Sequence, residues 1–301
     1  MGIGIGVLAT RHIWVGVVDE TTLGAVRMYP EPSESPLELK SLHAGDMLAL
    51  ICRMIVEISQ GQTVECVGAG FPGIIRNGVI EESPNLGQLK GLPVTRQLEA
   101  ELKSEGMDVP VVALNDADAI AAGIAATRGQ MEKLIRVWYL GDGVGFGRYP
   151  LGDGVWEAGH SVVSLDPKER YCGCGGAGHL EGIMGNRAIR LRFLDKEPEE
   201  VFAAAREGDQ KAREFVTRWH RALAAATATS VHLDGPGRIY LAGPNADYID
   251  TALLGMFLQE MVKMSCLQGS FFEVVPTSHD LALIGASVSA KAKAKSAARV
   301  H

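Results

Sequence analysis

The chain has 301 residues, 47% of them apolar and 22% charged, a composition typical of a globular protein. Its net charge of −7 argues against nucleic acid as a main partner, because phosphate backbones are bound by surfaces rich in Lys and Arg. No apolar run reaches the roughly 18 to 20 residues that span a bilayer, and the first residues lack the basic region of a signal peptide. Five cysteines are too few, and odd in number, for a disulfide framework. We therefore expect a cytoplasmic protein with no membrane partner.

Apolar runs separated by turn residues predict an antiparallel meander of strands within residues 3–29. Apolar residues then recur at helical spacing over 42–58, and a short apolar run at 63–69 predicts a buried strand. Further strands are predicted within residues 109–114, 134–149, 238–242 and 271–275. Helices are predicted over 95–103, 116–127, 180–193, 198–207, 210–233, 248–264 and 281–290. Strand-turn-strand units followed by helices open both halves of the chain, which indicates two α/β domains.

A cluster of sulfur and imidazole donors lies in the middle of the chain. The letters EAGH occupy positions 157–160, and CGCGGAGHLE occupies positions 172–181. Two cysteines flanked by two histidines supply the four donors of a closed tetrahedral zinc site. The alternative is a Gly-rich turn with two incidental thiols and a loop histidine bonded to backbone. Zinc is favoured because the glycines let the chain wrap around an ion. The glutamates beside the terminal metal ligands suggest that the segment also binds a molecule rich in hydroxyls.

Asp116 is the candidate for catalysis, because it lies where a buried strand ends and an Ala-rich helix begins. A carboxylate held there stays ionised and can accept the proton of an attacking hydroxyl. The competing interpretation is a helix N-cap without chemistry. Gly-rich turns at 141–147, 175–178 and 243 follow apolar strands, where backbone N–H groups can cradle phosphates, although hairpins also need glycine.

Three motifs occur in the order and spacing of the ROK family, and the chain resembles that family over nearly its whole length. The motifs are NDADA at 115–119, LGDGVG at 140–145, and the EAGH and CxCGxxGHLE elements just described. The family groups bacterial sugar kinases with repressors and has an actin-like, ribonuclease H-like fold of two α/β domains around a central cleft. The resemblance implies a smaller domain of residues 1–115 with a C-terminal helix at about 286–301. It implies a larger domain of 116–285, with the zinc segment at 157–181.

The resemblance also implies roles for single residues. Asp116 matches the catalytic base. The residues that match or resemble sugar-binding positions are Asn85, Asn115, Asp116, Glu157, His160 and Glu181. The structural zinc ion would be held by His160, Cys172, Cys174 and His179, where the family usually has Cys in place of the last. The nucleotide side would use Thr10, Gly141, Asp142, Gly143 and Gly243.

The phosphate loops depart from the family pattern. Where the family has an Asp followed by Gly-Gly-Thr, this chain reads GVLATR at positions 6–11, so the loop lacks the magnesium-site Asp and carries bulky Leu8. Asp142 stands where the family commonly has Thr, and a carboxylate about 4 Å from a phosphate charge would cost roughly 4 kcal/mol at an effective dielectric near 20. Either Asp142 replaces the missing Asp, or the nucleotide site has decayed. Phe146, where small residues are usual, favours decay.

Two functions follow from this contrast. The first is a ROK-type sugar kinase that transfers the γ-phosphate of ATP, bound with Mg²⁺, to a hydroxyl of a hexose or N-acetylhexosamine, with Asp116 as general base. The second is a sugar-binding or regulatory protein of the same fold that has lost ATP binding. The repressor branch is not expected, because the chain starts at its first strand without a helix-turn-helix segment. The resemblance also implies a homodimer or homotetramer.

Overall fold

The computed structural model describes residues 2–30, 39–152, 154–194, 196–276 and 279–298. They form two compact units. The first consists of Met1–Ile135, Gly147–Val155 and Ser278–His301, and the second of Arg136–Phe146 and Trp156–Thr277. Both units combine strands with helices, so the α/β class expected from the sequence is confirmed.

The first unit is built on a five-stranded sheet of order β3-β2-β1-β4-β7. β1, β2 and β3 form the expected antiparallel meander, and β4 and β7 extend it in parallel. The strands are β1 (Ile3–Ala9), β2 (Ile13–Asp19), β3 (Thr22–Tyr29), β4 (Val64–Phe71) and β7 (Val111–Asn115). The helices are α1 (Ala44–Ser59), α2 (Val94–Ser104), α3 (Asp116–Thr127) and α9 (His279–Ala298). A hairpin that the sequence did not predict, β5 (Ile74–Arg76) with β6 (Val79–Glu82), follows β4.

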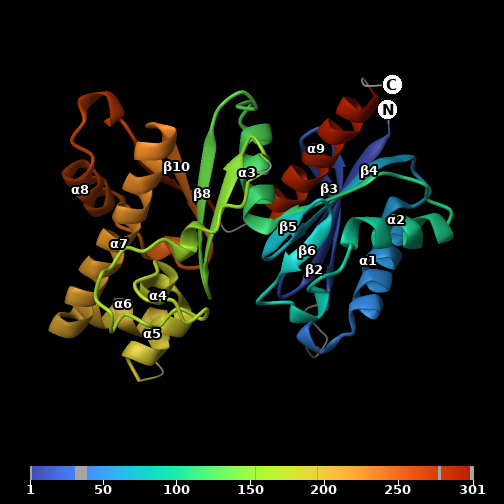
Figure 1. Cartoon of the computed structure of the whole chain (residues 1–301). Helices are drawn as coiled ribbons and strands as arrows, with labels where there is room; N and C mark the ends of the chain where they lie inside the picture. The colour runs from blue at the N-terminus through green and yellow to red at the C-terminus, as the bar shows by residue number, and fades with distance from the viewer. Residues whose placement is uncertain (1, 31–38, 153, 195, 277–278, 299–301) are drawn as a thin grey trace. The chain divides into compact units, whose positions relative to one another are not determined.

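The two faces of β1 explain its alternating sequence. Ile5 and Val7 are fully buried in the core that the sheet shares with α1 and α2. Burial of such a side chain contributes about 1.5–3 kcal/mol. Gly6 lies on the other face, where a β-carbon would come within 2.0 Å of the Leu283 carbonyl oxygen of α9. Gly6 therefore lets the backbone of α9 lie directly on the sheet (Figure 1).

The second unit is built on a sheet of order β11-β10-β8-β9, in which β10 runs parallel to both β8 and β11. The strands are β8 (Ile135–Leu140), β9 (Val144–Tyr149), β10 (Arg238–Ala242) and β11 (Phe271–Val274). The helices are α4 (Glu181–Met184), α5 (Asn186–Arg192), α6 (Pro198–Glu207), α7 (Gln210–Asp234) and α8 (Thr251–Met261). Short 3-10 turns are η1 (Leu39–Ser41) and η2 (Gly87–Leu89) in the first unit, and η3 (Ala158–His160), η4 (Ala246–Tyr248) and η5 (Ser265–Leu267) in the second.

Three element boundaries differ from the sequence-based expectation. The helix expected over 180–193 is two helices, because Gly185 between them has extended backbone (φ −69°, ψ 148°). The helix expected over 248–264 is the η4 turn followed by α8, whose first turn is capped by the Asp250 carboxylate. The last helix continues through the Lys-rich segment to residue 298.

The division into compact units also differs from the expected domain boundary at residue 115. α3 belongs to the first unit, because it packs along α9. The expected domains, 1–115 with 286–301 and 116–285, stay a prediction, and residues 299–301 lie outside the described part.

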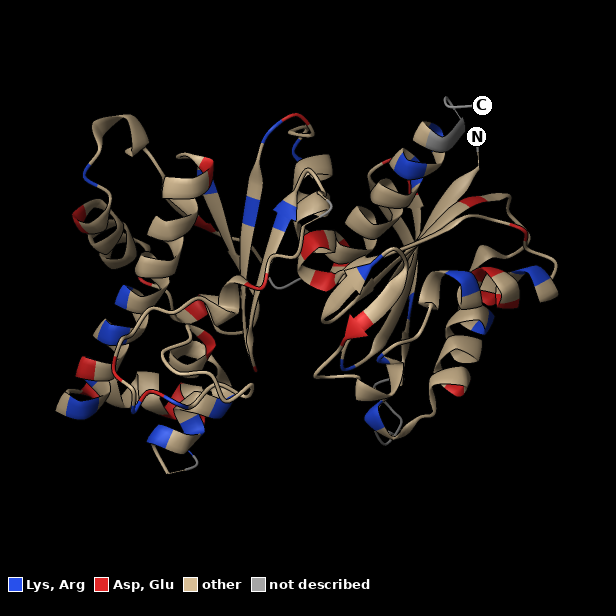
Figure 2. Cartoon of the chain, in the orientation of Figure 1, with Lys and Arg blue, Asp and Glu red and all other residues tan. Residues whose placement is uncertain are grey.

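Charged residues of both signs are interspersed along the helices, for example on α6 and α7 in Figure 2. Among the described residues, no helix combines the length and apolar character needed to cross a bilayer.

Candidate functional site

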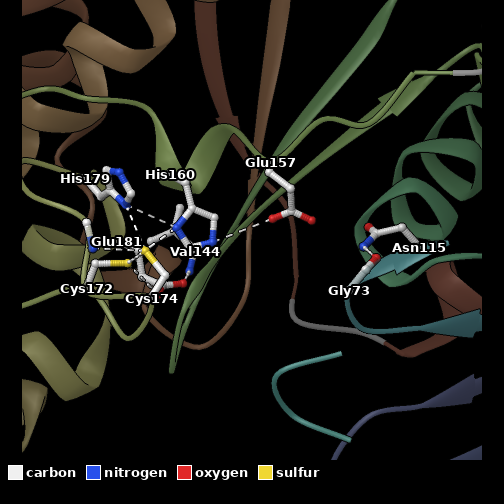
Figure 3. Close-up of polar contacts among 10 residues, drawn as sticks. Gly73, Asn115, Val144, Glu157, His160, Cys172, Cys174, His179 and Glu181 are labelled. Carbon is white, nitrogen blue, oxygen red and sulfur yellow. Dashed lines mark hydrogen bonds and ion pairs between the residues drawn. The ribbon is translucent and has the colours of Figure 1, made fainter. Parts of the chain in front are cut away.

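The sequence-predicted site residues fall into a group in each unit. In the first unit, Asn115 ends β7 and is the N-cap of α3, because its side-chain oxygen accepts hydrogen bonds from the backbone N–H groups of Ala117 (2.8 Å) and Asp118 (3.3 Å). Its amide nitrogen donates to the Gly73 carbonyl (2.9 Å), as Figure 3 shows. The side chain is thus fixed at both ends, which satisfies two of the free N–H groups of the helix.

Asp116 is the first residue of α3, and the structure gives the capping role to the residue before it. One carboxylate oxygen of Asp116 accepts a hydrogen bond from the Ala117 N–H (2.9 Å), and the residue is half-buried. The positive end of the helix dipole favours the ionised carboxylate at this place. This geometry is compatible with the proton-accepting role that the sequence predicts.

The other two predicted residues of the first unit lie in turns. Thr10 follows β1, and its backbone N–H donates to the His12 carbonyl (3.0 Å). Leu8, two residues earlier, is a buried residue of the strand. Asn85 is exposed in the loop between β6 and η2. Both residues are placed at strand ends on the chain, where ligand-binding loops are common.

In the second unit, the four predicted metal ligands come together. The donor atoms of His160, Cys172, Cys174 and His179 all lie within 4.8 Å of one another. Cys172 Sγ is 3.3 Å from Cys174 Sγ and 3.4 Å from His160 Nδ1. His179 Nδ1 is 3.2 Å from Cys174 Sγ and 3.4 Å from His160 Nδ1 (Figure 3).

These separations fit a zinc ion. With Zn–N and Zn–S bonds of about 2.0 and 2.3 Å, the donors of a tetrahedral site lie about 3.3–3.8 Å apart. Burial and the neighbouring His160 ring lower the pKa of His179, which favours the neutral imidazole that binds metals. Burial raises the pKa of the Cys172 thiol to about 12, and a divalent cation would supply the charge that stabilises its thiolate.

Glycines allow the zinc segment to fold this tightly. Gly178 has a positive φ of 73°, and a β-carbon on it would lie 1.9 Å from the Ser164 carbonyl oxygen. Its N–H donates to the Glu169 carbonyl (2.7 Å), which places the next residue, His179, against the other donors. Only glycine allows both the positive φ and the close approach to the Ser164 carbonyl without strain.

Glu181 lies between the donor cluster and the Gly-rich turn after β8. One of its carboxylate oxygens accepts from Cys172 Sγ (3.3 Å), and the other accepts from the Val144 N–H (3.2 Å). Glu157 approaches the same cluster from the other side, with a carboxylate oxygen 3.8 Å from His160 Nε2. Partial desolvation raises the pKa of Glu157 while His160 lowers it. The Glu157 side chain is 42% exposed, so its carboxylate is open to solvent.

The predicted nucleotide-side residues of this unit also meet. Asn186 Nδ2 donates to the Asp142 carboxylate (3.2 Å), and Asn245 Nδ2 donates to Asn186 Oδ1 (2.6 Å). This chain of side chains joins the turn that contains Gly141, Asp142 and Gly143 to the turn that begins at Gly243. Asn186 and Asn245 were not predicted from the sequence, because no local pattern marks amides that pair across 59 residues.

Phe146 has a different role from the one expected. Its ring lies 4.6 Å from that of Trp138 and is buried in the core of the second unit. The expectation that this residue marks a decayed phosphate turn stays a prediction, since packing of the ring does not test phosphate binding. The missing Asp and glycines of the first phosphate loop, at residues 6–11, are seen in the sequence, and their effect on nucleotide binding stays a prediction.

Comparison with known proteins identifies the family. The ROK family model matches residues 43–293. A glucokinase from Thermotoga maritima is 32% identical over 80% of this chain and 84% of its own length. An N-acetylmannosamine kinase from Escherichia coli is 32% identical over 54% of this chain and 58% of its own length.

A solved structure gives the same answer for the fold. The ROK hexokinase from Thermus thermophilus superposes with a TM-score of 0.75 and 25% identity, covering 98% of this chain and 99% of that one. The actin-like α/β fold expected from the motifs is thereby confirmed. The chain belongs to the ROK family, and its relatives there include sugar kinases.

Proposed function

We propose that the protein is an ATP-dependent sugar kinase that phosphorylates a hydroxyl of a hexose or N-acetylhexosamine. The hydroxyl oxygen attacks the γ-phosphorus, the bond to the β-phosphate oxygen breaks, and ADP leaves. The proton of the hydroxyl passes to the Asp116 carboxylate. The proposal draws on relatives named glucokinase and N-acetylmannosamine kinase, each 32% identical to this chain.

The observation that carries the proposal is the placement of Asp116. It is the first residue of α3, half-buried, and follows an asparagine that is itself fixed by three hydrogen bonds. A carboxylate that is held rigidly and kept ionised is what a phosphoryl transfer needs to orient the nucleophile and take its proton. Asn115 would accept from or donate to the hydroxyls next to the reacting one.

The zinc segment supplies a second group of proposed sugar contacts. His160, Cys172, Cys174 and His179 would hold the zinc ion, whose contribution is structural: it fixes the direction of its ligands. The second nitrogen of His160 then remains for a sugar hydroxyl. Glu157 and Glu181 supply carboxylate acceptors for further hydroxyls, and Asn85 is a further candidate contact.

The nucleotide would bind at the Gly-rich turns. Backbone N–H groups at Gly141, Gly143 and Gly243, with the hydroxyl of Thr10, are candidates for the phosphates of ATP. Asp142 is a candidate to hold the accompanying Mg²⁺, because Asn186 fixes one of its carboxylate oxygens and carboxylates suit this ion. We also propose that the enzyme acts in the cytoplasm as a homodimer or homotetramer, which sedimentation of the purified protein would test.

A second function is favoured by one observation. The turn after β1 carries Thr10, Arg11 and His12 and no carboxylate, and Leu8, two residues before Thr10, is buried. If that loop no longer admits a nucleotide, the protein is a sugar-binding or regulatory member of the family. Its sugar site would be the same.

A coupled assay distinguishes the two functions. Purified protein is supplied with ATP and Mg²⁺ and one of glucose, mannose, fructose, N-acetylglucosamine or N-acetylmannosamine. ADP release that depends on one of these sugars supports the kinase. Calorimetry that detects sugar binding but neither ATP binding nor turnover would overturn the kinase and support the alternative.

A further inference from the structure

A buried acid lies in the middle of the zinc segment, three residues before Cys172. Glu169 is 7% exposed, and its carboxylate forms ion pairs with Arg192, at the end of α5, and with Arg218 on α7 (2.6 Å). Arg192 contacts both carboxylate oxygens. A buried carboxylate persists only where its charge is compensated in this way. The segment is thus fastened to two helices at one point.

The backbone of Glu169 is fastened as well. Its carbonyl accepts the Gly178 N–H (2.7 Å), and its own N–H donates to the Asp166 carbonyl (3.0 Å). Gly178 is the residue before His179, a candidate metal ligand. The side chain of Glu169 therefore fixes a peptide group that in turn sets the position of that ligand.

Arg192 reaches both ends of the part of the chain that carries the ligands. Its guanidinium lies 4.0 Å from the ring centre of Tyr171, which precedes Cys172. One nitrogen also donates to the Gly182 carbonyl (2.7 Å), directly after Glu181. A single cation, paired with Glu169, thus contacts the chain before the first cysteine and after the candidate sugar-binding glutamate.

We propose that Glu169 is a positioning residue for the metal and sugar site, acting through Arg192 and Arg218. It holds the irregular segment so that Cys172, Cys174 and His179 are arranged before the ion binds, and it sets the orientation of Glu181. The part that concerns sugar rests on the proposed function. The part that concerns zinc does not, because it follows from contacts around the donor cluster.

The test replaces Glu169 by Gln in the full-length, zinc-loaded protein. Glutamine has nearly the same shape, but it leaves the two guanidinium groups uncompensated and turns an amide N–H group toward one of them. We expect zinc affinity, measured by competition with a chelator, to fall about 10–100-fold, the range for residues that orient metal ligands. The absorption spectrum of the Co²⁺-substituted protein should change, because it reports the geometry of the thiolate ligands.

The kinetic part separates positioning from general destabilisation. With glucose or N-acetylmannosamine as substrate, KM for the sugar should rise while KM for ATP stays near the wild-type value. Glu169→Asp, which keeps the charge, should recover part of the zinc affinity. Glu260→Gln is the matched control, because it removes an exposed ion pair with Arg221 (2.8 Å), also on α7, away from the zinc segment. It should bind zinc as the wild type does.

Two results would overturn the proposal. One is a folded Glu169→Gln protein with wild-type zinc affinity and an unchanged cobalt spectrum. If the Glu169→Gln protein does not fold, Arg218→Gln replaces it, because Arg192 still pairs with the acid in that variant. Wild-type zinc affinity in Arg218→Gln would also overturn the proposal. A wild-type protein that binds zinc but phosphorylates no sugar would contradict the proposed function. The zinc measurements would still test the positioning role of Glu169.

Discussion

The two groups of proposed sugar-binding residues are supported in different ways. Asn115 and Asp116 lie at the junction of a sheet strand and a helix, where backbone hydrogen bonds and a helix cap fix them. His160 and Glu181 flank an irregular segment that contains the four candidate metal ligands and a buried acid paired with two arginines. The first group is held by regular secondary structure, and the second by side-chain contacts and, as we propose, a zinc ion. The two should therefore respond differently to mutation and to chelators.

The largest effect is expected from Asp116→Asn. Asparagine keeps the size of the side chain and the start of α3, but it cannot accept the hydroxyl proton, so kcat should fall about 10²–10⁴-fold. Sugar binding should stay close to that of the wild type, because the preorganised backbone is unchanged. Single-turnover kinetics and sugar titration by calorimetry would measure the two separately.

Asp118→Asn is the matched control for this prediction. Asp118 lies on the same helix, and its carboxylate accepts the Arg148 N–H (2.8 Å), a bond that the oxygen of an asparagine can also accept. Activity should therefore be nearly retained. Equal losses in the two variants would show that charge near α3, and not a base at position 116, determines the rate.

Removal of the metal should affect the second group. Cys172→Ser, or chelation of the wild type, should release about one equivalent of zinc and weaken sugar binding by about 10–100-fold, because His160 loses its fixed orientation. ATP binding should change little. Metal analysis together with calorimetry measures both effects.

Cys266→Ser provides the control for the thiol substitution, because Cys266 is exposed in the η5 turn and is no part of the donor cluster. It should keep both the zinc and the sugar affinity. A protein that is purified without zinc and still binds sugar as tightly would show that the metal does not orient His160 for sugar binding.

The first group should depend on close helix packing. Gly285 of α9 lies against α3, where a β-carbon would be 1.8 Å from the Ala119 carbonyl oxygen. Gly285→Ala should destabilise the protein by about 1–3 kcal/mol, because α9 must shift away from the helix that begins at Asp116. Urea unfolding followed by circular dichroism measures this.

Gly255 of α8 is the comparison, since an added β-carbon there has no described atom within 4 Å. Gly255→Ala should stabilise the protein by about 0.5–1 kcal/mol, because alanine loses less conformational entropy in a helix. Similar effects of the two substitutions would show that the contact between α3 and α9 is looser than the structure indicates.

The sequence predicted the elements better than the contacts that fix the site. An Ala-rich run located α3, a short apolar run located β7, and ligand type and spacing located the four candidate metal ligands, because these signals are local. The break at Gly185 was not predicted. The chain there contacts a turn far away in the sequence: the Asn186 N–H donates to the Gly141 carbonyl (3.1 Å), and a β-carbon on Gly185 would lie 2.8 Å from the Asp142 carbonyl oxygen. Glu169 was missed for the same reason, since its guanidinium partners come from α5 and α7.

The smallest effect is expected from His220, which lies in a helix of the second unit. A variant at this position would distinguish the pH dependence of stability that comes from packed helices from the part that comes from the zinc segment. The ring is 1% exposed; Nδ1 bonds to the Val216 carbonyl (2.8 Å), and Nε2 accepts the Asp250 N–H (2.9 Å). Burial lowers the pKa of His220, so the folded state keeps the ring neutral.

The sign of the effect follows from this direction. An unfolded histidine titrates near pH 6.5, so the contribution of His220 to stability is complete above about that pH. It decreases as the pH falls below this value toward the lower folded pKa, because the unfolded chain takes up the proton first. Urea unfolding between pH 8 and 5 should therefore show a steeper loss of stability in the wild type than in His220→Gln, which cannot titrate. Both proteins carry the same candidate zinc ligands, so protonation of those ligands cancels when the two stability curves are subtracted. If the free energy of unfolding falls equally with pH in both proteins, His220 makes no contribution, and the loss of stability in acid comes from the zinc segment and other groups.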